Sequence, residues 1–165
     1  MTCPMCNKEH AYTITQALAR LAATTRRLER ITSAPGARRA AVRPAPGKWS
    51  QKEIIAHLAD CELVYGMRYR KIIAEPDAVL VAFDQEAWAE NLRYREHPLK
   101  SALATFRILR GGNVALLKSL PAAAWKRKGL HPAYGALTLQ QIVVHLADHD
   151  RNHIAQLERL SGISR

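Results

Sequence analysis

The sequence has few aromatic residues and no long apolar run, and both absences restrict what the chain can be. Aromatic residues make up 6% of its 165 residues, so aliphatic side chains and alanine must fill the core. Nowhere do about 18 apolar residues follow one another, which is the length that a membrane-spanning helix needs, so we expect no membrane segment. The first residues, Met1 to Cys6, lack a basic region followed by an apolar stretch. This start predicts no secretory signal and a cytoplasmic protein.

Several catalytic signatures are also missing. There is no glycine-rich phosphate loop, no dinucleotide-binding fingerprint and no serine in a nucleophile elbow. These absences argue against nucleotide-dependent chemistry and against serine hydrolysis. The chain has three cysteines, and an odd number does not suggest a disulfide framework.

Acidic residues are fewer than basic ones, and the formal net charge is +11. The basic excess lies at the two ends: residues 1–50 carry nine Lys or Arg against two acidic residues, and residues 99–165 carry ten against three. The middle, 51–98, carries six against nine. Because no aromatic residues alternate with the basic ones as in a nucleic-acid stacking surface, we expect most of this charge to be solvated and do not predict nucleic-acid binding.

Four segments have the periodicity of amphipathic helices, and turn-rich stretches separate them. They cover about 13–32, 50–74, 98–120 and 138–160, with a short extra helix expected at 84–94. Ser50 and Thr138 open capping-box patterns, while Gly111 and Gly112 could kink or split the third long helix. No segment is convincing as a strand. The sequence therefore predicts a single all-α domain over 1–165, a four-helix bundle with long connecting loops.

The last predicted helix carries two histidines on its core face. Positions 142, 146, 149, 153, 156 and 160 form one stripe, and Ile142, Leu146 and Leu160 make it apolar. His149 and His153 lie on either side of its centre, one turn apart, where two imidazoles are placed to hold one cation. The alternative is a pair of ordinary core histidines, each of which would need partners for its ring nitrogens.

Three further residues could act near such a site. His57 lies at the edge of the core stripe of the second helix and can point at a neighbouring helix. Cys61, one turn on, could also reach a metal, although a single buried cysteine is more often a small apolar residue. His145 is displaced about 60° toward the flank of the last helix. It could support the ligands from outside, carry protons, or be a plain flank histidine.

The amino-terminal Cys3 and Cys6 form a CxxC pair, which can bind zinc or cycle as a redox pair. A complete structural zinc site needs a second pair of ligands, and only His10 follows nearby. Cys3 and Cys6 are therefore candidates for a second metal site or a redox pair without a full ligand set. Because His10, His97 and His131 fall in terminal or loop contexts, they are not predicted as ligands.

Three groups of residues resemble motifs of the DinB/YfiT-like family of small metal-binding bundles. They are Pro46 to Ser50 with Glu53, His57 to Asp60 and Glu62; Asp84 to Ala89; and Leu137-Thr138 with His145 through Gln156. The match covers about 45–160 and leaves 1–10 as an amino-terminal extension. The resemblance implies one divalent metal held by three histidines, which correspond to His57, His149 and His153, with open positions for water or substrate. It also implies a homodimer.

We expect from these features a metal-dependent thiol transferase or a hydrolase acting on a small molecule. The metal would be zinc, nickel or iron, which imidazole ligands do not distinguish, and it would lower the pKa of a bound thiol or water. The resemblance suggests a low-molecular-weight thiol as cosubstrate, and Arg68 or Arg151 could attract its anionic groups. The alternative is a non-catalytic metal-binding module or stress-response sensor, because no second carboxylate or nucleophile appears on the metal-facing stripes.

Overall fold

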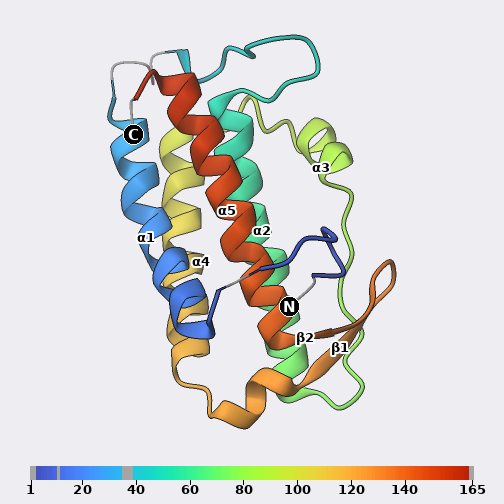
Figure 1. Cartoon of the computed structure of the whole chain (residues 1–165). Coiled ribbons are helices and arrows are strands. Elements are labelled where there is room, and N and C mark those ends of the chain that lie inside the picture. Colours follow the sequence, from blue (N-terminus) through green and yellow to red (C-terminus); the bar gives the residue numbers. More distant parts are fainter. Residues whose placement is uncertain (1–2, 11, 35–38, 164–165) are drawn as a thin grey trace.

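Four long helices dominate the computed structural model, which describes residues 3–10, 12–34 and 39–163 (Figure 1). They are α1 (Ile14–Thr32), α2 (Gln51–Ala74), α4 (Leu99–Lys118) and α5 (Leu139–Ser161). Helix α1 packs against α4 and α5, and α2 packs against the same two helices. The four therefore form a bundle, and the predicted all-α architecture is confirmed.

Three of the long helices begin at capping boxes, at Thr13, Ser50 and Thr138. In each box the hydroxyl accepts a hydrogen bond from the backbone N–H of the third helical residue, whose own side chain accepts one from the cap N–H. The two boxes predicted from sequence, at Ser50 and Thr138, are confirmed. Helix α5 ends at Gly162, whose φ of 66° is a left-handed conformation that glycine adopts without strain.

Helix α4 runs without interruption through Gly111 and Gly112, although the sequence allowed a kink or a split there. Two glycines weaken a helix by about 1 kcal/mol each, which tertiary packing can offset. Phe106, Arg110 and Val114 are buried on the face of α4 that the bundle covers, on both sides of the glycine pair. Packing of this face therefore keeps the helix continuous.

Among the described residues, the connections between the long helices include four short elements. They are α3 (Gln85–Asn91), the 3-10 helix η2 (Ala122–Lys126), and the strands β1 (Lys128–His131) and β2 (Gly135–Thr138). The strands pair antiparallel, with Lys128 opposite Thr138 and His131 opposite Gly135. The expectation of no strands was wrong here, because two strands of four residues are too short to show a period of two.

Tertiary contacts hold this hairpin on the bundle. The Leu130 N–H donates to the Ala78 carbonyl at 2.8 Å, and the Leu80 N–H donates to the Leu130 carbonyl at 2.9 Å. Gly129 packs so closely that a Cβ there would lie 2.6 Å from Leu80 Cδ2. Residues 79–83 remain loop apart from a single bridge at Val79. Within the described ranges, no helix combines the length and apolar character that crossing a membrane requires.

Candidate metal centre

Two histidines from facing helices meet in the interior of the bundle. His57 lies in the second turn of α2 and His149 near the middle of α5, and their Nε2 atoms are 3.1 Å apart. His57 is only 1% exposed. Two neutral imidazole nitrogens at this distance either share one hydrogen or turn two lone pairs toward one point. The second arrangement is the one that binds a cation.

His153 lies one turn beyond His149 on the same face of α5. Its ring centre is 4.5 Å from that of His149 and 5.1 Å from that of His57. Its Nδ1 is 3.3 Å from Oε1 of Gln156. Because an amide oxygen only accepts, Nδ1 carries the hydrogen and Nε2 keeps a lone pair for a ligand bond.

Cys61 joins this group from α2. Its Sγ is 3.4 Å from Nε2 of His57, and the ligand atoms of His57, Cys61 and His149 all lie within 4.8 Å of one another. Burial raises the pKa of the Cys61 thiol well above its usual value, and nearby carboxylates add to this effect. We name His57, Cys61, His149 and His153 the central cluster. It contains the three histidines proposed from sequence and a thiol as a fourth candidate ligand.

Two imidazoles of the central cluster, those of His57 and His153, are held neutral. Burial, followed by the charges of His149 and His153, lowers the pKa of His57 to about 2. Burial and the charge of His149 lower the pKa of His153 to about 4. A neutral imidazole is the form that ligates a metal, so these side chains are ready to bind at neutral pH without losing a proton.

A buried ion network lies behind His149. Arg110 of α4 donates from Nη1 to Oδ2 of Asp150 and from Nη2 to Oε1 of Glu62, each at 2.7 Å. Burial alone would raise the pKa of Asp150, but the charge and hydrogen bonds of Arg110 keep that pKa below its usual range. Asp150 is therefore an ionised carboxylate in the core. The sequence stripes did not reveal this network, because its members come from three different helices.

The second oxygen of Asp150 faces His149. Asp150 Oδ1 lies 3.9 Å from Nδ1 of His149, and among the described residues neither atom has a hydrogen-bond partner. A carboxylate behind the outer nitrogen is the usual way to orient a metal-ligating imidazole. This arrangement, together with the nitrogen and sulfur donors of the central cluster, fits zinc, nickel or iron.

The central cluster opens onto a cavity of about 470 Å³, whose wall includes His57, Cys61 and His149. Pockets of roughly 300–1,000 Å³ are typical of small-molecule sites. Two aromatic rings shield the cluster: Trp49 lies 4.9 Å from the ring of His57 and Phe83 lies 6.4 Å from it. The arrangement can therefore admit a small molecule to the histidines while limiting access of bulk water.

Of the two arginines considered from sequence, Arg68 lies in the cavity wall. Its guanidinium donates to the Val81 carbonyl, with Nε at 2.9 Å, and Nη2 lies 3.2 Å from Nε2 of His131. Arg151 instead lies on the outer face of α5, where its Nη2 pairs with Oδ1 of Asp148 at 2.6 Å. Arg68 is thus the cation that the cavity presents to a bound molecule.

Carboxylates also reach the cavity, from the start of α3. Asp84 and Glu86 both belong to its wall. Asp84 caps α3 by accepting from the Glu86 N–H, while Oε2 of Glu86 accepts from Nε1 of Trp49 at 3.2 Å. Sequence reasoning missed them because it searched only the stripes of the long helices. The metal-facing stripes of the long helices lack a second carboxylate, and the start of α3 brings one to the cavity.

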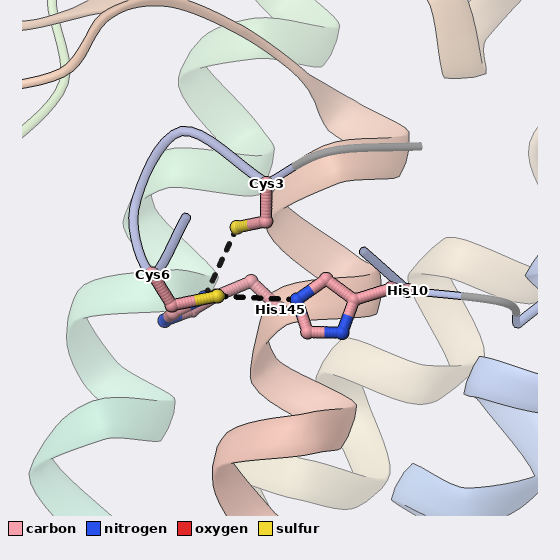
Figure 2. Close-up of side chains that lie close together, drawn as sticks. All are labelled: Cys3, Cys6, His10 and His145. Atoms are coloured by element: carbon pink, nitrogen blue, oxygen red, sulfur yellow. Dashed lines mark hydrogen bonds between the residues drawn. The ribbon is translucent and has the colours of Figure 1, made fainter. Parts of the chain in front are cut away.

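His145 lies apart from the central cluster and meets the amino-terminal cysteines instead. Figure 2 shows the imidazole of His145, from α5, among side chains of the first ten residues. Cys3 Sγ is 3.3 Å from Nδ1 of His145, and Cys6 Sγ is 3.2 Å from Nε2 of His10. The four ligand atoms all lie within 4.8 Å of one another. We name Cys3, Cys6, His10 and His145 the N-terminal cluster.

Two of the histidines set aside in the sequence analysis are buried, namely His10 and His131. His10 belongs to the N-terminal cluster and His131 lies beside Arg68 in the cavity wall. His97 is exposed. The spacing of Cys6 and His10 was the available signal for His10, whereas nothing in the sequence around His131 distinguishes it from a loop histidine.

Comparison with known proteins supports the architecture. A family model described as the DinB superfamily matches residues 20–157. A solved structure, titled "YfiT from Bacillus subtilis is a probable metal-dependent hydrolase with an unusual four-helix bundle topology", superposes with a TM-score of 0.79 at 22% identity. The superposition covers 99% of this chain and 98% of that one, and it shows a shared fold.

Curated relatives carry the same kind of name. "Putative metal-dependent hydrolase YfiT" of Bacillus subtilis is 28% identical over 116 residues, which are 70% of this chain and 65% of the relative. A relative from Oceanobacillus iheyensis, also named as a metal-dependent hydrolase, is 27% identical over 114 residues, 69% of this chain and 66% of its own. This chain thus spans just under two thirds of the length of each relative.

Proposed function

The chain belongs to the DinB superfamily, and on that premise we propose that it is a divalent-metal-dependent enzyme acting on a small molecule. The observation that carries this proposal is the 3.1 Å approach of the Nε2 atoms of His57 and His149 in the wall of a cavity of about 470 Å³. Three protein ligands with room for a fourth, exchangeable one are the pattern of catalytic metal sites. We propose His57, His149 and His153 as the ligands, and zinc, nickel or iron as the metal.

The names of the relatives support hydrolysis as the reaction. When bound at such a site, a divalent metal lowers the pKa of a water or thiol and so supplies a nucleophile at neutral pH. The side chains around the central cluster and its cavity have separate roles. Asp150 orients His149. Trp49 and Phe83 limit the entry of bulk water. Glu86 offers a carboxylate that can accept a proton.

A thiol transferase is the second candidate, and Arg68 favours it. Its guanidinium is buried in the cavity wall and lies 3.2 Å from His131, so the wall presents one cation beside the carboxylates of Asp84 and Glu86. Burial and the charge of Arg68 lower the pKa of His131, which leaves Arg68 as the cation there. Low-molecular-weight thiols commonly carry carboxylates, which Arg68 can attract. A homodimer remains a prediction.

Metal analysis and activity screening on matched variants test the proposal. The metal-loaded wild type, His149→Ala and the exposed control His97→Ala are offered two panels: small esters, amides and phosphoesters in water, and electrophiles with a low-molecular-weight thiol. We expect turnover in one panel, unchanged in His97→Ala and lost in His149→Ala. A metal-loaded wild type without turnover in either panel would favour the non-catalytic binding or sensor module.

The third ligand can be tested separately, because His153 and Cys61 approach the same two histidines. If His153 is a ligand, His153→Ala weakens metal binding by more than the roughly 10–100-fold that loss of an outer partner costs. Cys61→Ala then changes affinity by less than that range. Competition with a chelator of known affinity measures both. A larger loss of metal affinity in Cys61→Ala than in His153→Ala would make Cys61 the third ligand.

A further inference from the structure

The N-terminal cluster brings two thiols and two imidazoles to one point (Figure 2). Three of its members come from residues 3–10, outside the segment 20–157 that matches the DinB superfamily. Its fourth member, His145, lies 142 residues from Cys3 in sequence. The cluster thus fastens residues 3–10 to α5. We propose that the N-terminal cluster binds a structural zinc ion, independent of the metal of the central cluster.

The distances suit a tetrahedral ion. With Zn–S bonds of about 2.3 Å and Zn–N bonds of about 2.0–2.1 Å, neighbouring sulfur and nitrogen ligands lie about 3.6 Å apart. Two of the four sulfur–nitrogen distances in the cluster are 3.3 and 3.2 Å, close to this spacing, and the other two are within 4.8 Å. Two cysteines and two histidines are a complete structural zinc set, with no position left for substrate.

The local backbone turns both cysteines inward. The Asn7 N–H donates to the Cys3 carbonyl at 2.8 Å, and the Cys3 N–H donates to the Lys8 carbonyl at 2.9 Å. Asn7 adopts a positive φ of 51°, which asparagine tolerates better than most residues and which closes the turn directly after Cys6. A tight turn of this kind is what two cysteines three apart need to share one ion.

A carboxylate stands behind one histidine of the cluster. His10 Nε2 faces Cys6, while its Nδ1 lies 3.9 Å from Oδ2 of Asp148. Asp148 is buried and is held in turn by Arg151. A carboxylate on the outer nitrogen orients a zinc-bound imidazole and raises its basicity. The arrangement repeats, for His10, the relation between Asp150 and His149.

A redox pair explains the cluster less well. A catalytic CxxC attacks with an accessible thiolate, whereas here Cys3 is only 2% exposed and Cys6 is half-buried against His10. Neither does redox cycling require two imidazoles against the sulfurs. Zinc binding accounts for all four side chains, and it has a structural consequence. Met5 lies between the two cysteines and lines the cavity, so an ion here fixes one part of the cavity wall.

Cobalt substitution tests the proposal with a thiolate-specific signal. The full-length protein is stripped of metal, loaded with Co²⁺, and compared with Cys6→Ser and Cys61→Ser. We expect a thiolate-to-cobalt charge-transfer band in the wild type that is lost in Cys6→Ser and kept in Cys61→Ser. A band that disappears only in Cys61→Ser assigns the thiolate to the central cluster and overturns the proposal, as does the absence of any band.

Alkylation of the thiols tests the proposal in the wild-type protein, so no variant has to fold. In zinc-loaded wild type under reducing conditions, we expect Cys3 and Cys6 to resist alkylation until a strong chelator is added, as peptide mass spectrometry would show. Equal alkylation of both thiols with and without zinc would contradict the proposal. Because the readout concerns Cys3 and Cys6 alone, it stands whether or not the central cluster proves catalytic.

Discussion

The central cluster and the N-terminal cluster lie about one helical turn apart on α5 but differ in their ligand sets. The central cluster offers three imidazoles and one buried thiol beside a cavity, whereas the N-terminal cluster offers two thiols and two imidazoles whose ligand atoms all lie within 4.8 Å of one another. The rings of His145 and His149 are 6.5 Å apart. Under the two proposals, neighbouring positions on one helix contribute to a reactive centre and to a structural one, and the number and type of the ligands distinguish the two.

The supports behind the two clusters also differ. Asp150, behind His149, is buried with Arg110 in the core of the bundle. Asp148, behind His10, pairs with Arg151, whose side chain is half exposed. The central cluster therefore depends on the packing of the bundle, and the N-terminal cluster depends on a local ion pair at its surface.

The largest expected effect is that of removing the buried cation. Arg110→Met leaves Glu62 and Asp150 buried without a counter-charge, so we expect a loss of roughly 3–5 kcal/mol in the free energy of unfolding. Denaturant unfolding measures it, with the exposed Arg107→Met as control. Zinc at the N-terminal cluster should survive wherever the variant remains folded. A loss below about 1 kcal/mol would mean that the network does not hold the core charges.

The two carboxylates provide a matched pair of substitutions. Asp150→Asn should weaken metal binding at the central cluster by roughly 10–100-fold, and Asp148→Asn should weaken it only at the N-terminal cluster, near the lower end of that range. Chelator competition on each variant, with the other cluster disabled by His149→Ala or Cys6→Ser, separates the two affinities. If either substitution affected both sites equally, the clusters would be coupled rather than independent.

Sequence alone predicts much of this molecule, because its strongest signals are local. Capping boxes at Ser50 and Thr138 mark helix starts, and the spacing of His149 and His153 places both on one face of α5. The membership of His145 in the N-terminal cluster rests on a contact with Cys3 across 142 residues, which no local pattern contains. The same holds for Arg110, whose two carboxylate partners come from α2 and α5.

Acid stability should also distinguish the clusters. Burial, together with neighbouring charges, lowers the pKa of His57 to about 2 and that of His145 to about 4. Below pH about 6.5 these histidines become protonated in the unfolded chain but stay neutral in the folded protein. The metal-free protein therefore loses stability as the pH falls. Each contributes about 1.4 kcal/mol per pH unit while its folded form stays neutral. The contribution of His57 extends to about pH 2, and that of His145 ends near pH 4.

Unfolding midpoints between pH 7 and pH 3, measured in chelator, test this difference. We expect His57→Gln to flatten the dependence over the whole range and His145→Gln to flatten it only above about pH 4. The exposed His97→Gln serves as control and should leave the slope unchanged. If neither His57→Gln nor His145→Gln changed the slope of stability against pH, both histidines would already be protonated in the folded protein.

The smallest effect is expected far from both clusters. Apart from the backbone of its own helix and its chain neighbours, no atom of the described residues lies within 4 Å of the place where a Cβ on Gly111 would be, and the helix there is regular. Gly111→Ala should therefore stabilise the protein by about 0.5–1 kcal/mol, because alanine loses less backbone entropy in a helix. Thermal unfolding measures the gain, and metal content should be unchanged. A destabilised variant would indicate that α4 needs flexibility at this point.

The most direct test of two independent metal sites on α5 is the metal count of the native protein. Native mass spectrometry of zinc-loaded wild type, His149→Ala and Cys6→Ser gives this count in each case. We predict two ions per chain in the wild type and one in each variant, with none in the double variant. A wild type that holds a single ion, lost in both variants alike, would contradict the separation of the central cluster from the N-terminal cluster.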